Sequence, residues 1–276
     1  MWVRVLSIIS LVLAVNVASW VTNVQPASAA PLHIINGADV EEDEQIGIVG
    51  ILLAGVTDVY EAQFCGGTLI AAEWVLTAAH CTFDMEMSPF FAKDLDVVVG
   101  SNQLRNGMGE RVAVDRIVRH KDFDFATYYN DIALLHLERA VAAETVAWAS
   151  DTSVMKNSLA KATVMGWGVT EDGYGATTLK QANLPIVSQK SCAAFYAEQG
   201  YIVGQSMVCA GYKTGGIDAC AGDSGGPLLI WNNTTGQWLQ IGIVSAGAGC
   251  AEPGYYGLYT RLADFADWIA VMMEAI

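Results

Sequence analysis

Short β-prone runs, each bounded by Gly, Asn or Asp, follow one another along this chain from Ile46 onward. Their spacing is typical of an all-β sandwich or barrel. At 276 residues, 53% of them hydrophobic, the chain can bury a core, and two half-chain barrels fit with a linker near residues 140–154. The predicted strands are Ile48–Leu53, Thr68–Ile70, Val75–Thr77, Val97–Val99, Val112–Val118, Ile132–Leu137, Ala162–Met165, Pro227–Trp231, Leu239–Val244 and Gly257–Tyr259.

One helix is predicted near the C-terminal end, over Ala263–Met273. Apolar side chains in this stretch recur at the period of an α-helix. The residues that share one face of this helix are Leu262, Phe265, Ala266, Ile269 and Met273.

The charge balance excludes one class of partner. The chain has 14 Lys and Arg against 29 Asp and Glu, a net charge of −15. Binding to a phosphate backbone needs clustered cations that displace counterions, so nucleic acid is not an expected partner. An acidic surface keeps a protein soluble and mildly attracts basic substrates.

The first thirty residues have the organisation of a targeting segment. Arg4 precedes an apolar run, Val5–Val15, and a polar stretch then ends in the small-x-small pattern Ala27–Ala29. The alternative is a membrane anchor, but this run is too short to span about 30 Å of hydrocarbon. We predict a signal peptide over residues 1–29, cleavage after Ala29, and a secreted, extracellular protein.

The cysteines are interpretable once export is assumed. Their count is six, an even number, and no CxxC pair is present. In an oxidising compartment disulfides are therefore expected rather than metal ligands. Sequence alone does not choose among the complete pairings, although the order along the chain suggests three local loops. These would join Cys65 to Cys81, Cys192 to Cys209 and Cys220 to Cys250.

Three segments carry residues that could do chemistry. In Thr77–Cys81, His80 lies beside a cysteine just after a predicted strand. Asp131 directly precedes another predicted strand, the apolar run Ile132–Leu137. Each alone is a weak signal, because a lone His is usually structural and such an Asp is most often a turn or cap residue. Ser224 is more informative. It lies between Gly-Asp and Gly-Gly-Pro, on a tight turn where backbone amides can converge on one point.

Together these residues resemble the trypsin-like serine proteases, which have the chymotrypsin fold. The order His, Asp, Ser is that of this family, whereas subtilisin-like and α/β-hydrolase enzymes order the three residues differently. The resemblance runs from Ile34 to the terminal helix. The matching segments are Ile34–Gly37, Cys65–Ile70, the segments around His80 and Asp131, Gly166–Gly168, Asp218–Pro227, Ser245–Gly247 and Gly257–Thr260.

The resemblance implies a fold of two six-stranded Greek-key β-barrels with a C-terminal α-helix, over residues 34–276. It also implies a serine endopeptidase. Ser224 would be the nucleophile, His80 its general base, and Asp131 the group that orients the imidazole. The amides of Gly222 and Ser224 would form the oxyanion hole.

Activation is implied by the same resemblance. Residues 30–33 would be a short propeptide, and the new α-ammonium of Ile34 would pair with the buried acid Asp223. His33 precedes Ile34, where zymogens of the family usually have Arg or Lys. An enzyme specific for Arg or Lys would therefore not activate itself. A dipeptidyl aminopeptidase that removes residues 30–33, or an unrelated endoprotease, would suit this cut.

Specificity follows from residues around the nucleophile. Asp218, six residues before Ser224, matches the position at the base of the substrate pocket that carries an aspartate in trypsin. Ser245 belongs to a matching segment beside the pocket, and Gly247 and Gly257 match wall positions that must be small. The resemblance implies cleavage after Arg or Lys, because a buried carboxylate disfavours uncharged side chains.

Two features depart from the family pattern. Ala246 replaces the tryptophan that usually follows the serine of the Ser-Trp-Gly segment, which leaves the preference at the adjacent subsite open. Residues Gly100–Glu110 resemble a loop that binds calcium in some members, but Ser101 replaces the first acidic ligand and leaves Glu110 without an evident partner. We therefore expect no calcium site, since hard cations need several oxygen ligands.

Two other classes of function are alternatives to an active protease. A catalytically silent homologue that binds through the same fold usually lacks a triad residue or an oxyanion glycine, and a non-enzymatic toxin or adhesin scaffold has no supporting motif. The expected partners are polypeptide substrates, an activating protease and protein protease inhibitors. We expect no cofactor, no metal and no association with a membrane, and we expect a monomer. Asn232–Thr235 offers two overlapping glycan acceptors, meaningful only in a eukaryotic secretory pathway.

Overall fold

The computed structural model describes residues 34–41, 44, 46–155 and 161–275. The predicted signal peptide, the cut after Ala29 and the propeptide with His33 lie outside the described residues. The strands are β1 (Ala38–Asp39), β2 (Ile48–Leu53), β3 (Gln63–Ala71), β4 (Trp74–Thr77), β5 (Leu95–Val99), β6 (Glu110–Arg119), β7 (Ala133–Leu137), β8 (Ala147–Trp148), β9 (Lys161–Gly166), β10 (Lys180–Val187), β11 (Met207–Ala210), β12 (Pro227–Asn232), β13 (Gln237–Ala246) and β14 (Gly257–Arg261).

Helices are few among the described residues. The α-helices are α1 (Val59–Ala62), α2 (Gln189–Glu198) and α3 (Ala266–Glu274), and short 3₁₀ turns span His80–Thr82, Ala92–Asp94, Thr152–Met155 and Leu262–Asp264. None of these helices is long and apolar enough to cross a membrane.

The first half of the described chain closes into a barrel, in the order β2-β3-β4-β7-β6-β5. All its strand pairs are antiparallel. Side chains of β2 alternate between two environments, as the period of a strand requires. Val49 and Ile51 belong to the core inside this barrel, whereas Ile48 and Leu52 pack in a cluster with Trp167 of the second half. The sequence of β2 therefore contains no polar side chain.

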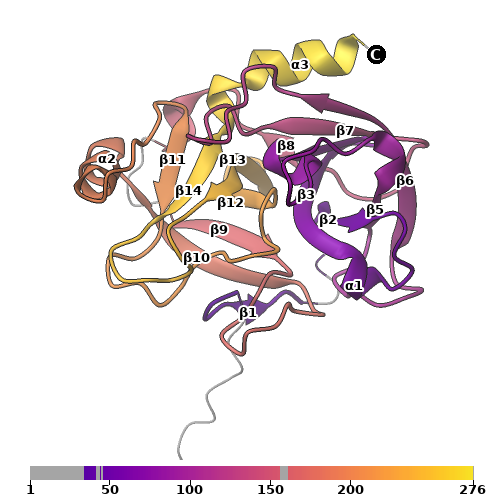
Figure 1. Ribbon diagram of the computed structural model, residues 1–276, viewed down its shortest axis with the longest axis horizontal. Coiled ribbons are helices and arrows are strands. Elements are labelled where there is room, and N and C mark those ends of the chain that lie inside the picture. The colour runs from indigo at the N-terminus through magenta and orange to yellow at the C-terminus, as the bar shows by residue number, and fades with distance from the viewer. Residues whose placement is uncertain (1–33, 42–43, 45, 156–160, 276) are drawn as a thin grey trace, which may run out of the picture. The chain divides into compact units, whose positions relative to one another are not determined.

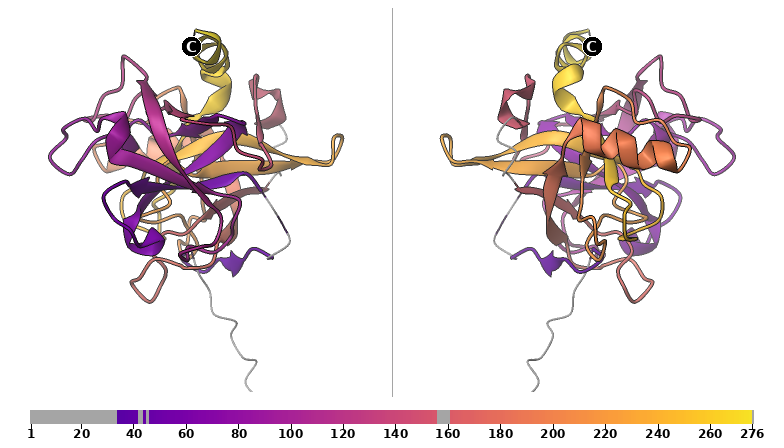
Figure 2. Two further views of the ribbon diagram at one scale, coloured as in Figure 1. Left: turned by 90° about the vertical axis from the view of Figure 1, so that its right-hand side faces the viewer. Right: turned by 90° about the vertical axis from the view of Figure 1, so that its left-hand side faces the viewer.

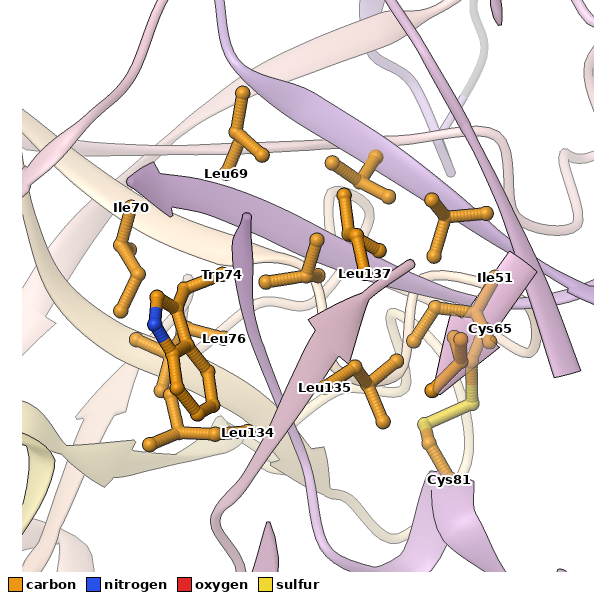
Figure 3. Close-up of a cluster of buried hydrophobic side chains, with 14 of the residues drawn as sticks. Ile51, Cys65, Leu69, Ile70, Trp74, Leu76, Cys81, Leu134, Leu135 and Leu137 are labelled. Carbon is orange, nitrogen blue, oxygen red and sulfur yellow. A yellow bond between two sulfur atoms is a disulfide. The ribbon is translucent and has the colours of Figure 1, made fainter. Parts of the chain in front are cut away.

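The core of the first barrel is tightly filled by aliphatic side chains (Figure 3). Leu69, Leu76 and Leu135 are fully buried there. The disulfide between Cys65 and Cys81 lies at one side of this cluster, where it joins β3 to the turn that follows β4. This bond fixes the position of the chain immediately after His80.

The second half forms another ring of six antiparallel strands. Its order is β9-β10-β11-β14-β13-β12, and β12 closes the ring on β9. The short strands β1 and β8 are added at its outside, on β10 and β13. The two barrels lie side by side (Figure 1), and the β12–β13 hairpin extends beyond the second one (Figure 2).

Helix α3 covers the first barrel although it follows the last strand of the second. Leu262, Phe265 and Ile269 are buried in the core cluster of the first barrel. The α-helix begins at Ala266, three residues later than predicted, because a 3₁₀ turn occupies Leu262–Asp264. Met273 is partly buried against the same cluster, so four of the five residues predicted on one face pack this segment onto the first barrel.

The predicted all-β class, the two six-stranded barrels and the C-terminal helix are confirmed. Nine of the ten predicted runs lie within strands, and the tenth, Ile132–Leu137, begins one residue before β7. The three local disulfides form, between Cys65 and Cys81, Cys192 and Cys209, and Cys220 and Cys250. Strands β1, β8, β10 and β11 and helices α1 and α2 were not predicted. In β10 the sequence KQANLPIV contains residues that disfavour strands, including Pro185. The signal-peptide, propeptide and barrel-boundary assignments stay predictions.

Candidate active site

His80 and Asp131 meet because they flank neighbouring strands. His80 follows β4 and Asp131 precedes β7, and these strands pair antiparallel with Thr77 opposite Ala133. Nδ1 of His80 lies 2.8 Å from Oδ2 of Asp131, and the backbone amide of His80 donates to Oδ1 at 2.9 Å. Two contacts from one residue fix the plane of the imidazole against the carboxylate.

Asp131 is fully buried, and the second barrel contributes to its environment. The hydroxyl of Ser245, in β13, donates to Oδ2 at 2.6 Å. The hydroxyl of Thr260, in β14, donates to the backbone oxygen of Asp131 at 2.8 Å. Hydrogen bonds to the charged form stabilise a buried carboxylate. Asp131 is therefore held from both barrels.

Ser224 lies in the turn that precedes β12. Gly225 has φ of +80°, and a Cβ on it would collide with the side chain of Thr77, so only glycine fits. The backbone amide of Gly66 donates a hydrogen bond to the backbone oxygen of Ser224 at 2.7 Å, which connects the turn to the first barrel. Ser224 thus stands where the two barrels meet.

The side chains of His80 and Ser224 line one cavity of ≈390 Å³. Within the described residues, the Ser224 hydroxyl and the imidazole do not form a hydrogen bond. Catalytic hydrogen bonds are often long or poorly aligned without substrate and tighten when it binds. Tyr128 packs its ring on His80 edge to face, with centroids 5.6 Å apart. No sequence signal singled out Tyr128, which precedes Asp131 by only three residues.

Two backbone amides beside Ser224 are available to a ligand. The amides of Asp223, Gly225 and Gly226 donate to backbone oxygens, whereas those of Gly222 and Ser224 have no acceptor among the described residues. Gly222 has φ of +93°, a conformation that favours glycine. The turn therefore leaves two donors close to the hydroxyl of Ser224.

Asp223 is fully buried behind this turn. Its carboxylate accepts hydrogen bonds from the amides of Gly168 at 2.8 Å and Cys220 at 2.9 Å. Burial raises the pKa of Asp223 to about 6. Within the described chain it forms no ion pair with a cationic side chain. Ile34 is also fully buried, in the core of the same barrel.

Asp218 lines the same cavity as His80 and Ser224 and is 5% exposed. Its two carboxylate oxygens accept hydrogen bonds from the amides of Ala219 at 2.9 Å and Ala251 at 3.2 Å. Burial, and secondarily the charge of Asp223, raise the pKa of Asp218 to about 7. No cationic side chain of the described residues pairs with it.

Glycines and a disulfide shape the cavity around Asp218. Gly247 and Gly257 line it, and a Cβ on Gly257 would stand 3.0 Å from Oδ1 of Asp218. Cys220 and Cys250 also line it, so their disulfide joins two of its walls. The structure thus brings the predicted pocket residues to one cavity.

A comparison with known families decides the affiliation of the chain. The family model described as Trypsin matches residues 34–269. The chain belongs to the trypsin family.

Individual relatives agree with this assignment. Trypsin 5G1 of Aedes aegypti is 36% identical over 249 residues, which cover 86% of this chain and 84% of the relative. Trypsin eta of Drosophila melanogaster is 34% identical over 243 residues, covering 86% and 87%. Serine protease 56 of Homo sapiens is 38% identical over 217 residues, covering 76% of this chain and 35% of the relative. As a member of the trypsin family, the protein is a serine endopeptidase that acts on polypeptides.

Two positions that depart from the trypsin family pattern have structural consequences. Ala246 lines the cavity of Ser224 and also a second one of ≈330 Å³, which contains Tyr128, Tyr201 and Ile202. Glu110, the acidic residue that remains in the loop resembling a calcium-binding loop, forms an ion pair with Arg139. This pairing could not be predicted, because Arg139 lies 29 residues further along the chain.

One group of potential metal ligands occurs among the described residues. It comprises Cys65, His80 and Cys81, whose ligand atoms lie within 4.8 Å of one another. The two sulfurs are joined in a disulfide, and a metal binds the thiolate form of cysteine. This proximity is therefore explained by the disulfide beside the imidazole.

Proposed function

We propose that the processed protein is a secreted endopeptidase that hydrolyses peptide bonds after Arg or Lys. Ser224 is the nucleophile, and the reaction proceeds through an acyl-enzyme. The family membership supports the reaction class, and the cavity shared by His80, Ser224 and Asp218 supports the residue assignments.

The first half of the reaction forms the acyl-enzyme. A serine hydroxyl is a weak nucleophile at neutral pH, so His80 takes its proton at Nε2 as Oγ of Ser224 attacks the carbonyl carbon. The developing oxyanion accepts hydrogen bonds from the amides of Gly222 and Ser224. His80 then gives the proton to the departing amine. In the second half, water attacks the acyl group with the same proton movements.

Asp131 supports both halves of the reaction through His80. Its contact with Nδ1 favours the tautomer in which Nε2 is free to accept the serine proton. The carboxylate also stabilises the imidazolium that each proton transfer creates. Because Ser245 donates to the same carboxylate oxygen, it acts as a positioning residue for the pair.

Asp218 carries the proposal of Arg or Lys specificity. It is a buried carboxylate in the reacting cavity, and no cationic side chain of the described residues compensates its charge. Burying an unpaired charge is costly, so a guanidinium or ammonium that enters gains a charge-assisted hydrogen bond. An uncharged side chain would leave the carboxylate unpaired, and would be rejected.

Activation is proposed to require a free amino group on Ile34. The side chain of Ile34 is buried in the second barrel, and Ile35 forms a β-bridge with Asp218. An α-ammonium on Ile34 would supply the cation that Asp223 lacks. That pair would hold the turn of Gly222 and Ser224 in the conformation that binds the oxyanion.

The route to this form involves export and two cuts. The signal peptide over residues 1–29 and the disulfides support a secreted protein. Cleavage after Ala29 leaves residues 30–33, two dipeptides, which a dipeptidyl aminopeptidase would remove. Because His33 precedes Ile34, the activating protease is a different enzyme.

The cavity beside Ala246 supports a preference next to the cleaved residue. The small Ala246 leaves space between Tyr128 and Ile202, and this space adjoins the cavity of Ser224. We expect a substrate with a large apolar side chain just before the cleaved residue to fill it. Cleavage of a peptide library by the processed enzyme tests the whole proposal. Cuts after Arg and Lys are expected, and cuts mainly after apolar residues would refute it.

A further inference from the structure

A second, larger cavity lies away from the catalytic residues. Its volume is ≈670 Å³, and it shares no lining residue with the cavity of Ser224. Its walls come from the segment before β2, the end of β3, the β8 segment and the β12–β13 hairpin. From Pro227 to Trp231, strand β12 rises about 13 Å away from the Ser224 turn. The hairpin that forms one wall extends beyond the barrel (Figure 2).

Three indole rings line this cavity, those of Trp148, Trp231 and Trp238. Trp231 and Trp238 are directly opposite each other in the β12–β13 register, and their rings meet edge to face with centroids 5.3 Å apart. Trp231 is nevertheless 49% exposed. An aromatic pair that is packed on one side and open on the other presents a rigid surface to a ligand.

The charged side chains of the cavity are all acidic among the described residues. Glu44 and Glu144 line it, and no Lys, Arg or His does. Neither carboxylate forms an ion pair or a side-chain hydrogen bond within the described part of the chain. Carboxylates beside electron-rich rings create a region of negative potential, and the chain as a whole has a net charge of −15.

We propose that this cavity binds a Lys or Arg side chain of a basic polypeptide. The cation would lie over the face of an indole, the ring that attracts cations most strongly, and would pair with Glu44 or Glu144. A neutral sugar would also stack on the indoles and donate hydroxyl hydrogen bonds to the carboxylates, but it carries no positive charge for the two acids and the rings to attract. Because the two cavities share no residues, this binding does not depend on the specificity proposed for Ser224 and Asp218.

Calorimetric titration of the processed protein tests the proposal. Asp218→Ala and Ser224→Ala are introduced together, so that the catalytic cavity neither cleaves nor holds a cation. The probe is an acetylated, amidated peptide in which three arginines alternate with glycines, and its neutral twin replaces each arginine with citrulline. The arginine peptide should bind, more weakly at high salt, and the citrulline peptide should bind at least about fivefold more weakly.

Variants assign the binding to this cavity. Trp231→Ala and Glu144→Gln should each weaken it about three- to tenfold. Tyr174→Ala and Glu198→Gln remove an exposed ring and an exposed acid elsewhere and should change nothing. Glu144 is exposed, so its variant tests the proposal even if Trp231→Ala fails to fold.

Several results would overturn the proposal. Three of them concern the peptides: equal binding of the two peptides, no binding at millimolar peptide, and unchanged binding in both cavity variants. The other two would show a different occupant: binding of a neutral oligosaccharide instead of the arginine peptide, or a dimer of the protein that the Trp231→Ala substitution converts to monomers. Failure of the catalytic assignment would leave the titration unaffected, because both catalytic-cavity variants are already present.

Discussion

Nδ1 of His80 and Oδ2 of Asp131 are 2.8 Å apart, although the two residues are 51 positions apart in the chain. Pairing of β4 with β7 brings them together within the first barrel. Ser224 and Ser245 reach the same place from the second barrel, so the proposed site exists only when both barrels are folded and in contact.

The first prediction concerns Asp131. Asp131→Asn should lower kcat about 10⁴-fold. An amide at this position stabilises the wrong tautomer of His80, and it has no negative charge to stabilise the imidazolium. Steady-state hydrolysis of an arginyl anilide measures this. Ser245→Ala is the matched control, since it removes one hydrogen bond from the same carboxylate and should have a much smaller effect. A loss of similar size in both variants would contradict the role of Asp131.

A second prediction follows from the pKa of Asp218, raised to about 7 by burial. A bound cation prefers the ionised carboxylate, so its affinity should fall as the pH drops below about 7, by up to about tenfold per pH unit. Titration of Ser224→Ala with an acyl-arginine amide at pH 5 to 8 checks this. Affinity that is independent of pH over this range would remove Asp218 from the binding site.

The raised pKa of Asp218 also makes the free energy of unfolding depend on pH. Because the folded-state pKa of Asp218 lies above its unfolded value, the native state binds more protons between about pH 4 and pH 7, and stability falls as pH rises through that window. Asp218→Asn should therefore raise the free energy of unfolding at pH 8 relative to the parent, and by less at pH 4. Urea titrations at both pH values measure it. A variant that is less stable at pH 8 would be inconsistent with a buried, uncompensated charge.

Strand β2 is predicted because its residues form one apolar run. Ile48–Leu53 is apolar on both faces because one faces its barrel and the other faces the second half. In contrast, β10 contains Lys180, which is buried and forms an ion pair with Asp39 of β1. Nothing local indicates that a lysine there lies in a central strand, because its partner is 141 residues away.

Some features of the candidate site could likewise be predicted from the sequence, and others could not. His80, Asp131 and Ser224 stand out through their flanking residues and their order, and Asp218 through its distance from Ser224. The cavity of Trp148, Trp231 and Trp238 could not be predicted, since it is assembled from four separate segments. Ser245 was expected beside the substrate, and it lines the cavity of Ser224. The contact of its hydroxyl with Asp131 was not expected, because that contact depends on how the barrels meet.

The fourth prediction concerns Ala246. Ala246→Trp should fill the adjoining cavity, and thereby lower kcat/KM about tenfold for substrates with an aromatic residue just before the cleaved arginine. Substrates with glycine there should be cleaved as before or faster. Paired arginyl anilides that differ only at that residue make the comparison. An unchanged preference would show that this cavity does not receive the substrate.

The fifth prediction concerns activation. Asp223→Asn should lower activity on the order of 10²–10³-fold in the processed enzyme, because the ammonium of Ile34 would lose its buried partner. Sequencing the N-terminus of active protein identifies its first residue. Any start other than Ile34 would contradict the proposed pair, as would full activity of the Asp223→Asn variant.

Hydrolysis of an arginyl anilide and a phenylalanyl anilide by the processed enzyme, with Ser224→Ala as the blank, tests the central claim most directly. We predict rapid hydrolysis of the arginyl compound, little of the phenylalanyl one, and neither by Ser224→Ala. Equal rates for the two compounds, or an arginyl rate that survives the loss of the Ser224 hydroxyl, would contradict the account.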